Sequence, residues 1–129
     1  MIVADSSVWI GHFRGAESEA CRKLYSIGLE EGLLVGDIIL LEILRGARDA
    51  RHARRMEDDL RRWDIVPMLG VALAIRAAEN YRALRSLGIA VRKAADLIIA
   101  TYCLAHGHAL LHNDRDFEPM CAHLGLRVV

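Results

Sequence analysis

The amino-acid sequence predicts an α/β fold, a three-layer α/β/α domain with a central parallel sheet of four to five short strands. Short apolar runs, such as IVA, LLVG and HALL, alternate with longer segments of helical periodicity. These runs carry almost no polar residue, which is typical of strands covered on both faces by helices. The 129 residues contain no linker or repeat, which favours a single domain over residues 1–129.

The first half of the chain is expected to hold two strands and four helices. Serine and aspartate mark helix starts because their oxygens accept hydrogen bonds from free backbone N–H groups. Glycine marks helix ends because it adopts the backbone conformation that terminates a helix. The expected elements are a strand at 2–4, a helix from Ser6 or Ser7 with a serine as N-cap, a helix over 17–31 ending at Gly32, a strand at 33–36, a helix capped by Asp37 and ending near Gly46, and an Arg-rich helix over about 48–62.

The second half continues the alternation of strands and helices. Its longest helix follows from the clear helical periodicity of VALAIRAAENYRALRSLG. The expected elements are a strand or extended segment at 64–68 closed by Pro67, a helix from 71 that stops at Gly88, a helix from 93 that stops at Gly107, a strand at 108–114, a short helix over 117–125 and a final strand at 126–129.

Composition excludes several classes of protein. The 17 basic and 17 acidic residues give a formal net charge of zero, so the chain is not a broadly basic nucleic-acid binder. No apolar run approaches the roughly 20 residues of a membrane span, and no signal peptide begins the chain. Cys21, Cys103 and Cys121 lie far apart, as reduced thiols do. We therefore expect a cytoplasmic protein without a membrane partner.

Glu42 is the acidic residue that fits its surroundings least. It stands in IILLEILRG, where every other residue from 38 to 44 is apolar. A helix that is apolar nearly all round is buried, and a buried carboxylate is costly unless it is paired or binds a metal. The alternatives are exposure on a wet edge of the helix and an ion pair with Arg45.

Other acidic residues are candidates for the same site. Asp5 and Asp114 follow predicted strands, and in parallel sheets the binding site lies beyond the carboxyl ends of the strands. Each candidate also has a structural explanation. Asp5 could cap the first helix or form a turn, and Asp96 could be a first-turn acid favoured by the helix dipole. Asp114 could form a turn, and Asp116 could cap the last helix.

Converging carboxylates would point to a metal. Clustered carboxylates repel one another and raise each other's pKa values, and a divalent cation relieves that repulsion. Sites made only of oxygen suit Mg²⁺ or Mn²⁺ rather than Zn²⁺. Such an ion can activate water for attack on a phosphodiester. The first strand would then end at Asp5 in order to supply a metal ligand.

Four motifs of the sequence resemble, in their order, the PIN domain, and specifically the VapC-type toxins of bacterial type II toxin–antitoxin modules. The motifs are IVADSSVWI, LLEILRG, AADLIIATYCLAHG and LLHNDRDF. The resemblance covers nearly the whole chain, and motif order and spacing both fit. It implies an endoribonuclease that depends on Mg²⁺, with Mn²⁺ able to substitute. At the matching positions it implies the catalytic, metal-binding acids Asp5, Glu42, Asp96 and Asp114, with Asp116 as an additional catalytic acid.

The resemblance also implies partners. These are a structured RNA substrate of the transfer or ribosomal RNA class, a VapB-type antitoxin that blocks the active groove, and a second copy in a homodimer. Ser6 matches a small hydroxyl residue that helps to orient the site. The sequence departs from the pattern in lacking a proline before Asp96. The stretch HNDRDF leaves Asp114 and Asp116 as rivals for the fourth ligand, and we favour Asp114 with Asp116 in support.

Two basic features and two alternative functions remain. Arg115 lies between two candidate acids and could contact RNA or neutralise those acids. Four other arginines form a stripe on one predicted helix, and we favour a solvated helix face for them (Arg48, Arg51, Arg55 and Arg62).

A receiver-like signalling module would also have an acidic Mg²⁺ pocket, but it needs a lysine at a strand end, and Lys93 precedes a helix. The third possibility is a catalytically silent PIN fold used only for binding.

Overall fold

The computed structural model describes every residue from 1 to 129 and contains four strands, seven α-helices and one 3-10 helix. The strands are β1 (Ile2–Ala4), β2 (Leu33–Gly36), β3 (Asp64–Val66) and β4 (Ala109–Leu111). The helices are α1 (Ser6–Phe13), α2 (Glu19–Glu31), α3 (Asp37–Leu44), α4 (Ala50–Leu60), α5 (Val71–Ser86), α6 (Ala94–His106), the 3-10 helix η1 (Arg115–Phe117) and α7 (Glu118–Leu124). None of the helices combines the length and apolar character needed to cross a bilayer.

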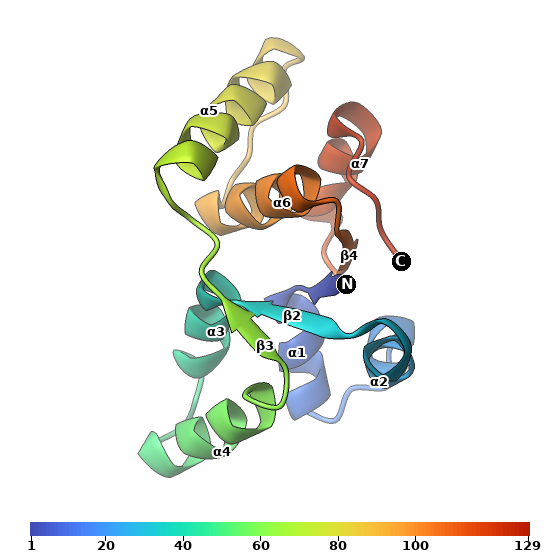
Figure 1. Cartoon of the computed structure of the whole chain (residues 1–129), viewed down its shortest axis with the longest axis vertical. Helices are drawn as coiled ribbons and strands as arrows, with labels where there is room; N and C mark the ends of the chain where they lie inside the picture. The colour runs from blue at the N-terminus through green and yellow to red at the C-terminus, as the bar shows by residue number, and fades with distance from the viewer.

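The strands form one parallel sheet in the order β3-β2-β1-β4. Ile2 of β1 lies between Leu33 of β2 and Ala109 of β4. Figure 1 shows the sheet between α5, α6 and α7 on one side and α1, α3 and α4 on the other. The predicted three-layer α/β/α architecture is confirmed, with four strands.

Burial explains why the strands are so apolar. Every residue of β1, β2 and β4 is buried, whereas the edge strand β3 is partly exposed. A polar side chain in the buried strands would lose water on both faces of the sheet without gaining a partner. Side chains from both helical layers join the strands in one core, among them Ile39 of α3 and Ile99 of α6.

The parallel sheet determines where polar residues can gather. Because the strands run in the same direction, the carboxyl ends of β1, β2 and β4 meet at one edge of the sheet. Asp5 directly follows β1, and Asp114 lies three residues beyond the end of β4. This edge is therefore where the candidate acids are expected to meet.

Several predicted boundaries were wrong. The expected strand at 126–129 is only an isolated bridge between Leu110 and Val128, because this segment pairs with β4 at a single residue. Gly36, not Asp37, is the N-cap of α3. The Asp37 carboxylate instead accepts hydrogen bonds from the backbone N–H groups of Ile38 and Met68, and so ties the start of α3 to the segment after β3. The helix predicted over 17–31 begins only at Glu19 and ends as expected, whereas the helix predicted over 48–62 is two residues shorter at each end.

Candidate active site

Asp5 lies buried at the junction of β1 and α1, with only 3% of its surface exposed. It is the N-cap of α1, which confirms the structural explanation considered for Asp5 and shows that the serine expected as N-cap was wrong. Its Oδ2 accepts hydrogen bonds from the backbone N–H of Ser7 at 3.1 Å and from Ser7 Oγ at 2.6 Å. Its Oδ1 is buried without any partner. Capping thus uses one oxygen of Asp5 and leaves the other available for a ligand.

Glu42 is half-buried on α3, and Ser6 Oγ donates a hydrogen bond to its Oε1 at 3.1 Å. Burial raises the pKa of this carboxyl above its ordinary value, and the Asp5 charge raises it further. The Asp5 effect means that the two carboxylates, 37 residues apart in sequence, lie near each other. The neighbouring Leu41 is 61% exposed, so the prediction that this helix is buried nearly all round was wrong.

Asp96 lies buried in the first turn of α6, again with only 3% of its surface exposed. Its Oδ2 has no hydrogen-bond partner. Burial raises the pKa of the carboxyl to about 6 even though the Lys93 ammonium opposes the shift, and the Asp5 and Asp114 charges raise it as well. The favourable position near a helix N-terminus therefore does not compensate Asp96 for its loss of water.

Asp114 and Asp116 complete the acidic group from the segment after β4. Asp114, not Asp116, is the cap here: its Oδ1 accepts a hydrogen bond from the Asp116 backbone N–H at 2.9 Å. That bond lowers the pKa of the Asp114 carboxyl, and Lys93 lowers it further. Lys93 Nζ lies 3.1 Å from Asp114 Oδ2, 3.7 Å from Asp96 Oδ2 and 3.9 Å from Asp116 Oδ2.

The arrangement suits a divalent cation. Oxygens of Asp96, Asp114 and Asp116 all lie within 4.8 Å of one another. Asp5 and Glu42 are near enough for their charges to affect the pKa of Asp96. The donors are all carboxylate oxygens, and two buried ones, on Asp5 and Asp96, have no hydrogen-bond partner. Mg²⁺ and Mn²⁺ prefer oxygen ligands, and negatively charged carboxylate oxygens that accept no hydrogen bond are free to bind them.

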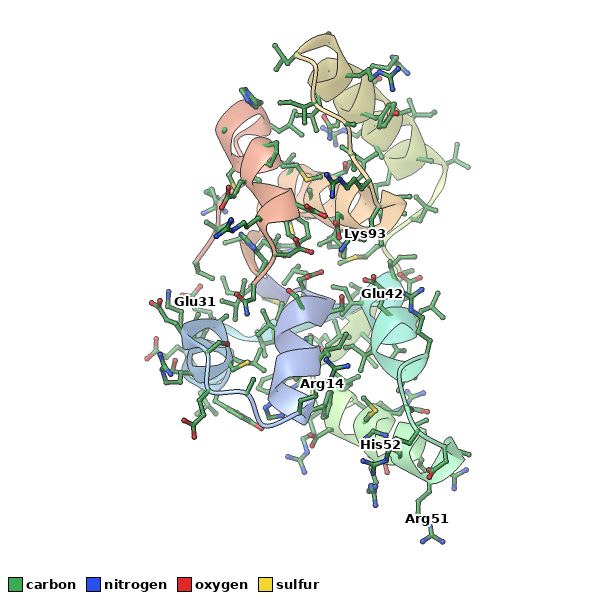
Figure 2. All side chains as sticks on the ribbon, turned by 180° about the vertical axis from the view of Figure 1, so that it is seen from behind. Arg14, Glu31, Glu42, Arg51, His52 and Lys93 are labelled. Carbon is green, nitrogen blue, oxygen red and sulfur yellow. The ribbon has the colours of Figure 1, made fainter.

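Figure 2 shows Glu42 and Lys93 near each other, where α3 meets the start of α6. Both line a groove between these two helices. On the other side of Asp96 lies a cavity of about 230 Å³, whose charged lining residues are Arg92, Asp96, Arg115 and Asp116. Arg115 itself is exposed. Members of the acidic group therefore line two recesses, Glu42 the groove and Asp96 and Asp116 the cavity.

Sequence reasoning missed two residues of this site. Lys93 was considered only as a residue preceding a helix, although its position three residues before Asp96 would have suggested an ion pair. Ser7, rather than Ser6, holds Asp5, and its Oγ also accepts a hydrogen bond from the Asn113 backbone N–H at 3.1 Å. No local sequence pattern indicates that contact, because Ser7 and Asn113 are 106 residues apart.

Comparison with known proteins places this geometry in a family. The chain matches the PIN domain over residues 2–122. It is 35% identical over 123 residues to VapC ribonuclease Mb1587 of Mycobacterium bovis and, to the same extent, to ribonuclease VapC11 of Mycobacterium tuberculosis. Each alignment covers 92% of this chain and 90% of the relative.

Solved structures agree with this assignment at the level of the fold. VapBC2 from Rickettsia felis, bound to a DNA fragment from its promoter, matches with a TM-score of 0.80 and 18% identity, over 100% of this chain and 98% of that chain. FitAcB from Neisseria gonorrhoeae matches with a TM-score of 0.77 and 21% identity, over 99% and 96% of the two chains. Together, the domain match, the sequence identity and the shared fold show that the chain belongs to the PIN-domain family of VapC ribonucleases.

Proposed function

We propose that this VapC-family ribonuclease acts as the toxin of a toxin–antitoxin module and cuts RNA internally with Mg²⁺ or Mn²⁺. Asp5, Glu42, Asp96 and Asp114 would hold the ion, with Asp116 beside them. The observation that carries the proposal is the pair of buried carboxylate oxygens that accept no hydrogen bond, Asp5 Oδ1 and Asp96 Oδ2. Buried charge of this kind is costly unless a cation completes it.

The chain's own side chains fix the geometry that the reaction needs. Ser7 holds Asp5, Ser6 holds Glu42, and the backbone N–H of Asp116 holds Asp114. Each of these hydrogen bonds uses one carboxylate oxygen, and the second oxygen of Asp114 is paired with Lys93. When bound, a divalent ion supplies the charge that stabilises a phosphodiester transition state and makes water a better nucleophile.

Arginines beside the acids suit an RNA substrate. Arg92 and Arg115 line the cavity of about 230 Å³ that also reaches Asp96 and Asp116. Arginine forms strong charge-assisted hydrogen bonds with phosphate. We assign to these two side chains the phosphates next to the one that is cut. The choice of structured RNA, of the transfer or ribosomal class, rests on the family resemblance.

An antitoxin is the proposed protein partner. Several solved structures that share this fold are toxin–antitoxin complexes. A groove of about 490 Å³ between α1, α3 and α4 offers apolar and basic side chains together, and Figure 2 shows two of the basic ones, Arg14 and His52, in this part of the molecule. Such a groove fits a VapB-type segment with apolar and acidic side chains.

The antitoxin proposal can be checked by growth. Expression of the chain alone is expected to arrest growth of the host cells, and co-expression of the small reading frame next to its gene is expected to restore it. Growth arrest that the neighbouring product does not relieve, with no complex on co-purification, would contradict the assignment of this partner.

A homodimer is the second proposed assembly. Four residues of α5, spaced as one helical face, are all exposed (Val71, Ala74, Ile75 and Ala78). Val71 is 81% exposed and Ile75 57% exposed. Exposed apolar stripes of this kind mark interaction sites, and a twofold axis can pair such a stripe with itself.

The remaining proposals concern location and the rival functions. All three cysteines are unpaired, as expected in the reducing cytoplasm, where we place the protein. Membership of the PIN family favours the ribonuclease over the receiver-like module. A catalytically silent PIN fold is distinguished only by experiment.

The decisive experiment is metal-dependent cleavage of total RNA by the purified chain, freed of any partner. We expect discrete fragments with Mg²⁺ or Mn²⁺, none with EDTA, and a loss of about a hundredfold or more in Asp5→Asn. Asp58→Asn, a change to an exposed acid on α4, is the control and should cleave normally. No cleavage by the wild type, together with no thermal stabilisation by Mn²⁺, would leave only the binding function.

A further inference from the structure

Lys93 lies in a position that its own helix does not favour. It is the N-cap residue of α6 and its side chain caps no backbone group. The N-terminus of a helix carries partial positive charge, so a cation there is locally unfavourable. Its ammonium nevertheless contacts the carboxylates of Asp114, Asp96 and Asp116 at 3.1 to 3.9 Å. The acids, not the helix, therefore account for where this side chain lies.

The Lys93 ammonium contacts the same three carboxylates that could hold a metal ion. The three carboxylate oxygens that approach Lys93 come from the same residues that lie within 4.8 Å of one another. An ammonium is a compact point charge on a flexible stem, unlike the planar guanidinium of arginine. The Lys93 side chain is 52% exposed, so it has room to move outward. An ammonium and a divalent ion would therefore compete for the negative charge of these three carboxylates.

We propose that Lys93 is a tethered counter-ion that occupies the carboxylate group when no metal is bound and is displaced when a divalent cation enters. This inference rests on the proposed metal site. In the metal-free protein Lys93 offsets part of the repulsion among the acids and so stabilises the fold. In exchange it competes with the divalent ion and weakens its binding. A divalent ion still prevails because it carries twice the charge and can also bind the buried Oδ1 of Asp5, which accepts no hydrogen bond and is not paired with Lys93.

The test is Mn²⁺ binding by isothermal titration calorimetry to the full chain, freed of any partner, at low ionic strength. Lys93→Met removes the charge and keeps the size, and it is expected to bind Mn²⁺ about fivefold more tightly than wild type. Lys93→Arg keeps the charge and should remain within about twofold of wild type. Lys23→Met is the matched control, because Lys23 is the only other lysine and pairs with Glu19 on α2 at 3.3 Å.

Thermal unfolding separates competition from a merely structural role. Lys93→Met should lower the melting temperature in EDTA, and saturating Mn²⁺ should remove that difference from wild type. Equal or weaker Mn²⁺ binding by Lys93→Met, or an equal loss of stability with and without Mn²⁺, would overturn the inference and leave the ribonuclease proposal intact. No Mn²⁺ binding by any variant would remove the metal site, and with it both proposals.

Discussion

Among individual residues, Asp96 shows how burial raises the pKa of a carboxyl group in the candidate site. Burial raises the pKa of its carboxyl from 3.8 to about 6, so between these values the folded chain binds a proton that the unfolded chain has lost. The free energy of unfolding contributed by this group therefore falls as pH rises from 4 to 6 and stays low above pH 6. Binding of a divalent cation must release the same proton, which makes metal affinity rise over this range.

Asp96→Asn tests this argument because asparagine is neutral at every pH. In EDTA at pH 8, the variant is expected to be more stable than wild type by about 1–3 kcal/mol, measured by urea unfolding. At pH 4.5 the difference should be clearly smaller, since Asp96 is then protonated in the folded state, and it should vanish only below the unfolded-state pKa of 3.8. A stability difference that does not change between these pH values would show that the Asp96 carboxyl is not responsible.

At the level of elements, Ser7 joins two loops at the edge of the sheet. Its Oγ donates to Asp5 at the end of β1 and accepts from the Asn113 backbone N–H after β4. Ser7→Ala breaks both hydrogen bonds and leaves an Asp5 oxygen without a hydroxyl donor. We expect a loss of about 2 kcal/mol in the free energy of unfolding and weaker Mn²⁺ binding, because Asp5 and the loop that carries Asp114 are no longer tied together.

The control for Ser7→Ala is Ser86→Ala. The hydroxyl of Ser86 donates to the Ala83 carbonyl in the last turn of α5, in an exposed position. Its loss should cost less than about 0.5 kcal/mol and leave Mn²⁺ binding unchanged. A Ser7→Ala protein as stable as the Ser86→Ala protein, with wild-type Mn²⁺ affinity, would refute the role of Ser7 as a link.

The elements also show what the sequence could and could not predict. The alternation of apolar runs and helical segments predicted the parallel sheet, and the strand-end rule placed Asp5 and Asp114 at one edge. Glu42 became a candidate because it interrupts an apolar helix, and the structure places it near Asp5 through Ser6. The sequence did not reveal Lys93 as a partner of the acids, because only the packing of α6 against the segment after β4 brings it there. The four-residue segment LRVV likewise could not show how many of its residues would pair with β4.

At the scale of the whole molecule, the candidate acids come from four separate parts of the chain and depend on the packing of both helical layers around the sheet. α1 and α3 supply one side of the site, and α6 and η1 supply the other. Figure 1 shows α5 at one end of the molecule, beyond α6. Its exposed apolar stripe therefore has no evident role in assembling the site, which is why we propose it as the surface that pairs with a second copy of the chain.

Ile75→Glu tests that pairing, because a charge in the middle of the α5 stripe would be buried at the dimer interface without a partner. The variant is expected to be a monomer in sedimentation velocity at concentrations where the wild type is a dimer, with an unchanged melting temperature of the monomer. Leu29→Glu is the matched control, since Leu29 is 85% exposed on α2, and it should remain a dimer. A wild type that is monomeric at every concentration, or an Ile75→Glu protein that still dimerises, would remove α5 as the interface.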